Sequence, residues 1–199
     1  SVIVGNQNGE IVSLSLDNGK KQWSYKTGAA IFSSPAIADN RVVLGSADSN
    51  IYCLDVKKGT VLWKKQTGAA VLGCPLINGD TVFIGGSDHI YRALNVKNGN
   101  VIWEYDGLDG PVVSRPVLYD GKLIFGAWDR NLYAVTSSRG EFSWKWNNGS
   151  SVRNFSPASC IPVIADGIIY IVAPDRFITA LDASSGQALW RNNDGGVRE

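Results

Sequence analysis

The sequence contains no methionine, a single histidine and three cysteines among its 199 residues. One histidine is too few for a multi-histidine metal centre, and three scattered cysteines are too few for a disulfide framework. No apolar run approaches the roughly 18 residues that a membrane-spanning helix needs, so no membrane span is expected. Because a natural reading frame begins with methionine, we expect the chain to be a processed product or a piece of a longer one.

Charged residues of either sign are also few, at 19% of the chain. There are 19 lysines and arginines against 18 aspartates and glutamates, which gives a formal net charge of +1. A nucleic-acid-binding domain usually has a strongly basic face, so we expect no nucleic-acid partner. With 44% hydrophobic residues, the chain is long enough to bury the core of one globular domain or one repeat array.

The main signal in the sequence is an internal repeat. Tryptophans recur at intervals of about 40 residues, a length typical of several repeat architectures. A glycine precedes each of these tryptophans by four residues, and a small residue precedes it by ten. The tryptophans are Trp23, Trp63, Trp103, Trp144 and Trp190, the glycines are Gly19, Gly59, Gly99, Gly140 and Gly186, and the small residues are Ser13, Cys53, Ala93, Ala134 and Ala180. We expect the tryptophan and glycine columns to have structural roles.

Each repeat predicts four short β-strands. Residues 31–68 contain four runs rich in Val, Ile, Leu, Tyr and Trp, separated by Gly, Asn, Asp and Ser. The glycine column marks the last turn of each unit, where one residue with positive φ is needed. The second run of each unit is almost continuously apolar, which is typical of a strand buried on both faces. Tight-hairpin dipeptides mark the first turn: Asp39-Asn40, Asn78-Gly79, Asp120-Gly121 and Asp166-Gly167.

Four-stranded antiparallel units that are buried on both faces are the blades of a β-propeller. We therefore predict an all-β fold in which the recurring tryptophan lies on an outer strand between neighbouring blades. Residues 1–199 form one repeat domain, with blades ending near residues 28, 68, 108, 149 and 195. The first residues align with a second strand and the last with the start of an inner strand. We expect about five blades in an incomplete arc of a larger ring, with self-association through the exposed terminal blades.

The strings CLDVKKGTVLW, ALNVKNGNVIW, AVTSSRGEFSW and ALDASSGQALW resemble the tryptophan-docking motif of PQQ-type propeller repeats. The consensus of that motif is A-x-D-x-x-T-G-x-x-x-W, and the resemblance spans essentially the whole chain. It implies a complete ring of seven or eight blades and a periplasmic or extracellular location in bacteria. The family includes quinoprotein dehydrogenases, outer-membrane assembly scaffolds and propeller modules attached to other domains.

Enzymes of this family bind PQQ in the central funnel and hold Ca²⁺ with carboxylate and amide ligands. In the alcohol dehydrogenases, PQQ stacks on a disulfide between adjacent cysteines. This sequence has no adjacent cysteine pair, and no Glu, Asn and Asp cluster matches that site residue by residue. We carry over no catalytic residue and predict no metal or cofactor, with PQQ and Ca²⁺ as the alternative.

Sequence variation concentrates on one face of the predicted blades, where the turn between the second and third strands meets the connections between blades. Variable loops on one face of a repeat protein often mark its binding face. We predict a cationic patch with aromatic neighbours there, suited to an anionic ligand or an acidic segment of a partner. Its residues are Arg115, Trp128, Arg130, Arg153, Asn154, Phe155 and Arg176. In the competing interpretation, each arginine pairs with a neighbouring aspartate such as Asp129 or Asp175.

Other polar features of this face are interpreted as structural. Aspartate recurs at one position of the turn, as Asp48, Asp88, Asp129 and Asp175. Since one active site does not need several copies, we expect each aspartate to accept hydrogen bonds from amides of its own loop. We interpret His89 as a surface histidine rather than a general base. The three cysteines are expected to be small, buried, apolar residues that form no disulfide.

Three functions remain open at this stage. The first is a non-catalytic PQQ-like propeller module that binds a protein, a carbohydrate or a small anionic ligand through its variable face. The second is a fragment of a PQQ-dependent dehydrogenase. The third is an accessory domain of a larger enzyme, for example a phosphoesterase.

Overall fold

The computed structural model describes residues 1–147, 149, 156–173 and 177–194. The described chain forms five antiparallel sheets, one of three strands and four of four strands. We call each sheet a blade and number the blades from the N-terminus. The only helical segment in these residues is a 3₁₀ turn, Pro157–Ser159. No helix in the described residues is long and apolar enough to cross a membrane.

Strands follow one another in chain order within every blade. Blade 1 consists of β1 (Val2–Gly5), β2 (Glu10–Leu14) and β3 (Lys21–Lys26). Blade 2 consists of β4 (Ala36–Ala38), β5 (Arg41–Ser46), β6 (Asn50–Asp55) and β7 (Val61–Gln66). Blade 3 consists of β8 (Leu76–Asn78), β9 (Thr81–Gly85), β10 (Tyr91–Asn95) and β11 (Val101–Tyr105). Blade 4 consists of β12 (Val117–Tyr119), β13 (Lys122–Gly126), β14 (Leu132–Thr136) and β15 (Phe142–Trp146). Blade 5 consists of β16 (Val163–Ala165), β17 (Ile168–Ala173), β18 (Phe177–Asp182) and β19 (Ala188–Asn192).

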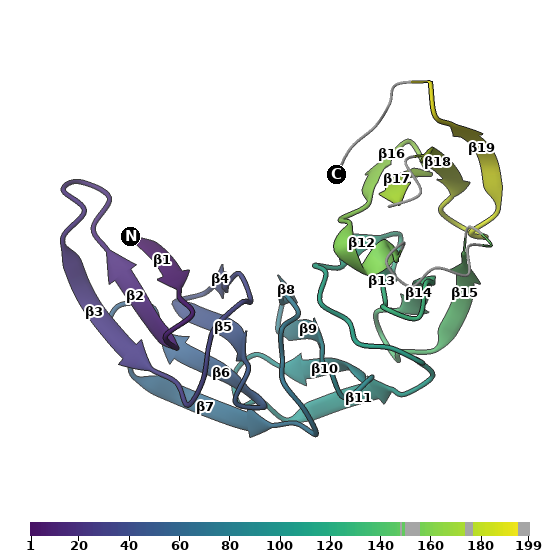
Figure 1. The fold of residues 1–199 in the computed structure, drawn as a ribbon. Coiled ribbons are helices and arrows are strands. Elements are labelled where there is room, and N and C mark those ends of the chain that lie inside the picture. Colours follow the sequence, from purple (N-terminus) through teal and green to yellow (C-terminus); the bar gives the residue numbers. More distant parts are fainter. Residues whose placement is uncertain (148, 150–155, 174–176, 195–199) are drawn as a thin grey trace.

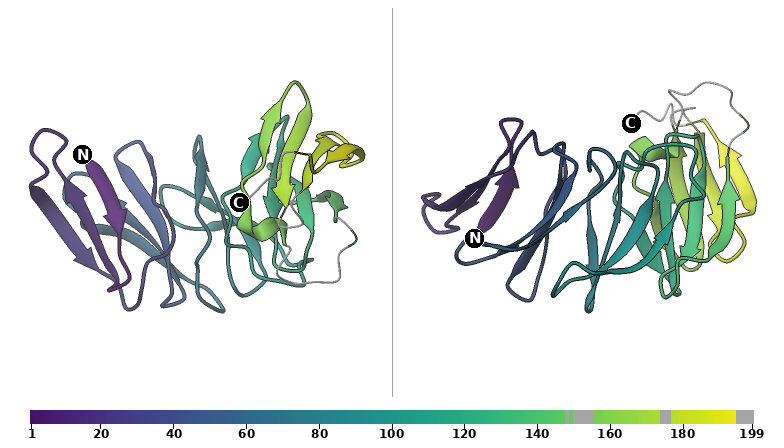
Figure 2. Two further views of the ribbon diagram at one scale, coloured as in Figure 1. Left: turned by 45° about the horizontal axis from the view of Figure 1, so that its top comes forward. Right: turned by 90° about the horizontal axis from the view of Figure 1, so that it is seen from below.

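The blades stand in a row that curves into an open arc (Figure 1), which confirms the predicted incomplete propeller. The first strands of blades 2–5 lie on the concave side of the arc, and the last strands, β3 to β19, lie on the convex side. Seen from two further directions, the sheets face their neighbours along the row (Figure 2). This arrangement buries both faces of every inner blade.

The hydrophobic core lies between the blades. One cluster joins Val43, Ile51 and Cys53 of blade 2 to Val82 and Leu94 of blade 3, and all of these side chains are buried. Such pairs of facing apolar surfaces explain why the second strands are almost continuously apolar. Burial also raises the pKa of the Cys53 thiol to about 12.

A tryptophan contact links each blade to the next. The indole N–H of Trp63 in blade 2 donates to the carbonyl oxygen of Val96 in blade 3, at 2.9 Å. Its ring lies against Gly99, where an added Cβ would come within 2.7 Å of the ring. The same contact joins four pairs: Trp23–Gly59, Trp63–Gly99, Trp103–Gly140 and Trp144–Gly186. We call each of them a docking pair; within the described residues, Trp190 and Gly19 take part in none.

The small residue of the repeat lies opposite the tryptophan across two hydrogen-bonded strands. Ala93 is paired with Trp103, and the register shifts immediately afterwards. The same bulge follows Cys53 opposite Trp63. A small side chain leaves space for the indole, while the bulge increases the local twist of the strand.

The cysteines depart from their prediction in part. All three are free, as expected. Only Cys53 is fully buried, whereas Cys74 and Cys160 are partly exposed. Both lie just before the inner strands and use their sulfur atoms in polar contacts: Cys74 accepts from the Ser34 amide, and Cys160 donates to the Val172 carbonyl. The prediction that all three are buried apolar residues is therefore wrong for these two.

Candidate functional site

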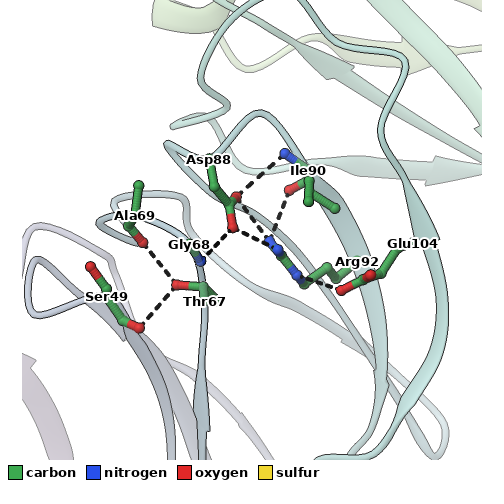
Figure 3. A network of polar contacts seen from close by, with 8 residues as sticks. All are labelled: Ser49, Thr67, Gly68, Ala69, Asp88, Ile90, Arg92 and Glu104. Carbon is green, nitrogen blue, oxygen red and sulfur yellow. Dashed lines mark hydrogen bonds and ion pairs between the residues drawn. The ribbon is translucent and has the colours of Figure 1, made fainter.

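The loop face is the end of the blades that carries the second turn of each sheet and the connections between blades. In blade 3, the Asp88 carboxylate joins neighbouring segments of this face through hydrogen bonds and an ion pair (Figure 3). Its carboxylate accepts from the backbone amide of Gly68 at 2.9 Å and from the amide of Ile90 at 3.4 Å. Arg92 donates to both carboxylate oxygens, at 2.6 and 3.0 Å. Burial raises the pKa of Asp88, but these hydrogen bonds outweigh burial and hold the pKa below its usual value.

The aspartates of blades 2 and 4 have the same role. Asp48 accepts from the amide of Gly28 and from the hydroxyl of Tyr52. Asp129 accepts from the amide of Asp109 and from the hydroxyl of Tyr133. Each aspartate therefore ties its own turn to the connection that arrives from the preceding blade.

Bonds to amides of the same loop confirm part of the prediction for this column. Asp88 accepts from Ile90, and Asp129 accepts from Asn131 at 2.9 Å. The bond from the amide of the incoming connection, which is 20 residues away in the chain, was not predicted from the sequence. A periodic pattern shows which position recurs, but not which distant segment folds onto it.

Arg92 replaces a tyrosine at one position of the network. It is buried between Asp88 and the partly exposed Glu104, to which it donates at 2.9 Å. The equivalent residues Tyr52 and Tyr133 meet their aspartates with a hydroxyl group instead. Because a buried charge is costly without partners, this arginine serves the structure of blade 3.

A cavity of about 570 Å³ opens on the loop face between blades 3 and 4. We call it the blade 3–4 cavity. Its lining comes from the turn of blade 3, the connection between the two blades and the turn of blade 4: His89, Asp109, Gly110, Pro111, Trp128, Asp129, Arg130 and Asn131. The volume is within the usual range of small-molecule sites, about 300–1,000 Å³.

The backbone of the connection lies directly against the turn of blade 4. The Trp128 amide donates to the Pro111 carbonyl at 2.9 Å. At Gly110, an added Cβ would lie 2.5 Å from the backbone nitrogen of Asp129, so this position needs glycine. This close approach fixes the floor of the cavity and leaves the Trp128 side chain exposed at its edge.

Two cavity residues have an uncommon backbone conformation. His89 has φ of +62° and Arg130 has φ of +76°. Positive φ is uncommon for residues other than glycine, although asparagine, aspartate and histidine adopt it more often than the rest, and the strain costs about 1–3 kcal/mol. Asn131 is held by the Asp129 carbonyl and by Asn147, and an adjoining cavity of about 160 Å³ continues past both asparagines.

The predicted patch residues that the structure describes lie in two places. Trp128 and Arg130 line the blade 3–4 cavity together. Arg115 lines a different cavity beside the inner strands, with Ile77 and Leu118. The remaining predicted residues lie outside the described residues: Arg153, Asn154, Phe155 and Arg176.

The cavity is also lined by His89, Asp109 and Asn131, which were not among the binding residues predicted from the sequence. His89 occupies the same turn position as Arg130, directly after the recurring aspartate, which is the signal that connects the two. Asp109 carried no such signal, because it lies in a connection whose path the sequence does not reveal.

The described residues do not fit PQQ or Ca²⁺ as those groups are held in the dehydrogenases. Within the described part of the chain, no three or more His, Cys, Asp and Glu side chains are placed so that they could hold a metal ion. The carboxylates of the recurring aspartates Asp48, Asp88 and Asp129 accept from backbone amides, hydroxyl groups or Arg92. We therefore assign no residue to either group.

Solved structures of other proteins share this fold. BamB from Moraxella catarrhalis matches with a TM-score of 0.76 and 19% identity, over 95% of this chain and 57% of that one. A quinohemoprotein alcohol dehydrogenase from Pseudomonas putida HK5 matches with a TM-score of 0.81 and 15% identity, over 96% and 40%. A europium-containing methanol dehydrogenase matches with a TM-score of 0.80 and 14% identity, over 96% and 48%. Identities this low show the fold alone, and the chain spans 57% or less of the length of these proteins.

Comparison with curated protein sequences gave no match. The family model described as outer membrane protein assembly factor BamB matches the chain in two stretches, residues 1–107 and 107–198. These stretches include every blade and all four docking pairs. The chain therefore belongs to this family of PQQ-type propeller proteins.

Proposed function

We propose that the chain is a non-catalytic binding module whose blade 3–4 cavity takes a small acidic carbohydrate. The observation that carries this proposal is the cavity itself, in which an exposed indole stands beside polar and charged side chains. The cavity opens on the loop face, which is also the end of the blades where the sequence varies most between repeats. The periplasm or the outside of the cell is the proposed location, in keeping with the name of the matching family.

The lining suits a ligand with one apolar face and several polar groups. The Trp128 ring offers a flat apolar surface at the edge of the cavity, on which a sugar ring can stack. Arg130 and His89 offer donors for a carboxylate. Asp109 offers acceptors for hydroxyl groups. A hexuronic acid or a short oligosaccharide that contains one has this combination of groups.

Titration calorimetry with hexuronic acids and their neutral hexose counterparts tests the proposal. We expect the acid to bind more tightly than the neutral sugar. Trp128→Ala and Arg130→Gln should each weaken binding by about tenfold or more, since a lost contact of this kind costs about 1.4 kcal/mol. Arg115→Gln is the matched control, because Arg115 lines a different cavity, and it should leave the affinity unchanged.

Two results would contradict this function. One is the absence of binding by every acidic sugar, and the other is equal loss of affinity in the Arg130→Gln and Arg115→Gln variants. The alternative function, a fragment of a PQQ-dependent dehydrogenase, predicts tight stoichiometric binding of PQQ with Ca²⁺. The same titration with PQQ and Ca²⁺ distinguishes it.

A further inference from the structure

The last strand of blade 2 is an edge strand. β7 ends the strand order of its sheet and lies on the convex side of the arc (Figure 1). In an antiparallel pair, part of the amides and carbonyls of a strand bond to its neighbour, and the others point away. The outward groups of β7 therefore pair with no other strand within the described residues. Such an edge can accept an added strand from another chain.

Blade 2 differs from its neighbours in the charge of its outer hairpin, which we define as the last two strands of a blade and the turn between them. In blade 2 this hairpin contains four lysines and one acidic residue: Lys57, Lys58, Lys64, Lys65 and Asp55. The outer hairpins of blades 3 and 4 each contain two cationic residues and one glutamate. The formal charge is therefore +3 in blade 2 and +1 in blades 3 and 4.

These lysines take no part in the ion pairs that join described residues. Asp55 does not neutralise an ammonium group, because its carboxylate accepts from the backbone amides of Lys57 and Lys58, both at 2.8 Å. The Lys64 ammonium lies 5.1 Å from the centroid of the Tyr52 ring. Lys57, Lys58 and Lys64 are exposed. The outer hairpin of blade 2 thus presents positive charge that no carboxylate of the described residues compensates.

The order of side chains along β7 indicates which kind of strand would fit beside it. Trp63 faces blade 3, so Lys65 lies on the same face of the strand and Lys64 lies on the opposite face. An added strand alternates its side chains in the same way, so two consecutive acidic residues would meet Lys64 and Lys65. Val61 and Leu62 are 37% and 46% exposed, and they would contact apolar residues next to the acidic pair.

We propose that β7 accepts an extended acidic segment of a partner protein as an added strand. Main-chain hydrogen bonds give affinity in this mode, and side chains select the segment. The lysines of the outer hairpin attract the acidic segment and orient it. Lysines on an edge strand also prevent pairing between copies of the same chain, and here the same charges that keep two β7 edges apart favour an acidic partner. The proposal does not depend on the carbohydrate site.

An NMR titration with a short peptide tests the proposal. The probe is the capped peptide Thr-Val-Glu-Glu-Val-Thr, which has the six-residue length of β7 and presents the same side chains in parallel and antiparallel pairing. Backbone amide signals of residues 61–66 should shift, whereas those of residues 142–146 in β15 should not. The neutral peptide Thr-Val-Gln-Gln-Val-Thr should bind about fivefold more weakly or worse, because it lacks the ion pairs.

A second peptide separates strand addition from charge attraction alone. Thr-Pro-Glu-Glu-Pro-Thr has the same charge as the probe, but one of its two prolines removes an amide that would face β7. It should therefore also bind more weakly than the probe. Equal binding of the two acidic peptides would contradict the addition of a strand.

Two double variants locate the binding surface. Lys58→Glu with Lys64→Glu should weaken binding of the probe by about tenfold or more, since attraction becomes repulsion. Arg139→Glu with Lys145→Glu is the matched control, because it changes the same two repeat positions in blade 4 and alters the net charge equally. The control should leave the affinity unchanged. Both double variants should keep the carbohydrate affinity of the wild type.

Several results would overturn the proposal. They are the absence of amide shifts in β7 at peptide concentrations up to about 10 mM, equal binding of the acidic and neutral peptides, and equal loss of affinity in the two double variants. Vesicles that contain phosphatidylglycerol provide the remaining comparison. Binding to these vesicles that is lost in the Lys58→Glu, Lys64→Glu variant, without binding of the peptide, would assign the surface to an anionic membrane instead.

Discussion

At the level of single residues, Gly140 allows the Trp103 indole to lie flat against the last turn of blade 4. An added Cβ would overlap this ring. Gly121 is a close match for comparison, with φ of +71° against +70° at Gly140 and nothing within 4 Å. Gly121→Ala should cost about 1 kcal/mol through backbone strain alone. Gly140→Ala should cost about 1–3 kcal/mol more, because the ring must move.

Urea unfolding of the two variants, monitored by circular dichroism, measures this difference. Equal losses of unfolding free energy would show that Gly140 serves only the turn and not the docked indole.

Asp48 supplies a test of the loop face by pH. Burial raises its pKa, but hydrogen bonds from Tyr52, Asn50 and Gly28 bring the pKa below its usual value. A carboxylate whose folded-state pKa is lowered adds stability above its unfolded pKa, about 3.9, and that stability is lost as the pH falls through the folded pKa. The free-energy gap between the wild type and Asp48→Asn should therefore be largest near pH 7 and shrink below about pH 4. Unfolding titrations at several pH values measure the gap, and a gap independent of pH would contradict this role.

At the level of elements, the tryptophans of the repeat are of two kinds: four are docked on a following blade, and Trp190 is not docked within the described residues. Trp103 is buried between blades 3 and 4, and its N–H donates to the Ser137 carbonyl at 3.0 Å. Trp190 has no following blade within the described chain and is exposed. In the monomer, Trp103→Ala should cost about 3–5 kcal/mol of unfolding free energy, and Trp190→Ala less than about 1 kcal/mol. Comparable costs at the two positions would contradict docking as the source of stability.

Strands and turns were predictable because they depend on local chemistry. Positive φ at Asp39 and Asn40 follows directly from the hairpin dipeptide in the sequence. The blade 3–4 cavity was only partly predictable. Trp128 and Arg130 stood out as departures from the repeat, whereas Asp109 enters the cavity because Gly110 allows the connection to approach the next blade. This contact joins the connection at Gly110 to the turn at Asp129. The repeat pattern of the sequence does not show which distant segments touch.

At the level of the whole molecule, four repeated interfaces hold the blades in a single row (Figure 1). Stability in such an array is close to a sum over blades and nearest-neighbour interfaces. The recurring tryptophan and glycine columns predicted this row and its incomplete ring, because each column recurs once per blade. They did not predict the separation of Arg115 from Arg130: Arg115 lies just before the inner strand β12, whereas Arg130 lies in the turn between β13 and β14.

The most direct test of this account is exchange of the indole N–H protons with solvent, measured by NMR. Four indole protons donate to backbone carbonyls of the following blade: those of Trp23, Trp63, Trp103 and Trp144. The account predicts slow exchange for these four and fast exchange for Trp190, whose side chain is exposed. Uniformly fast exchange at all five positions, or equal protection of Trp190 and Trp103, would contradict it.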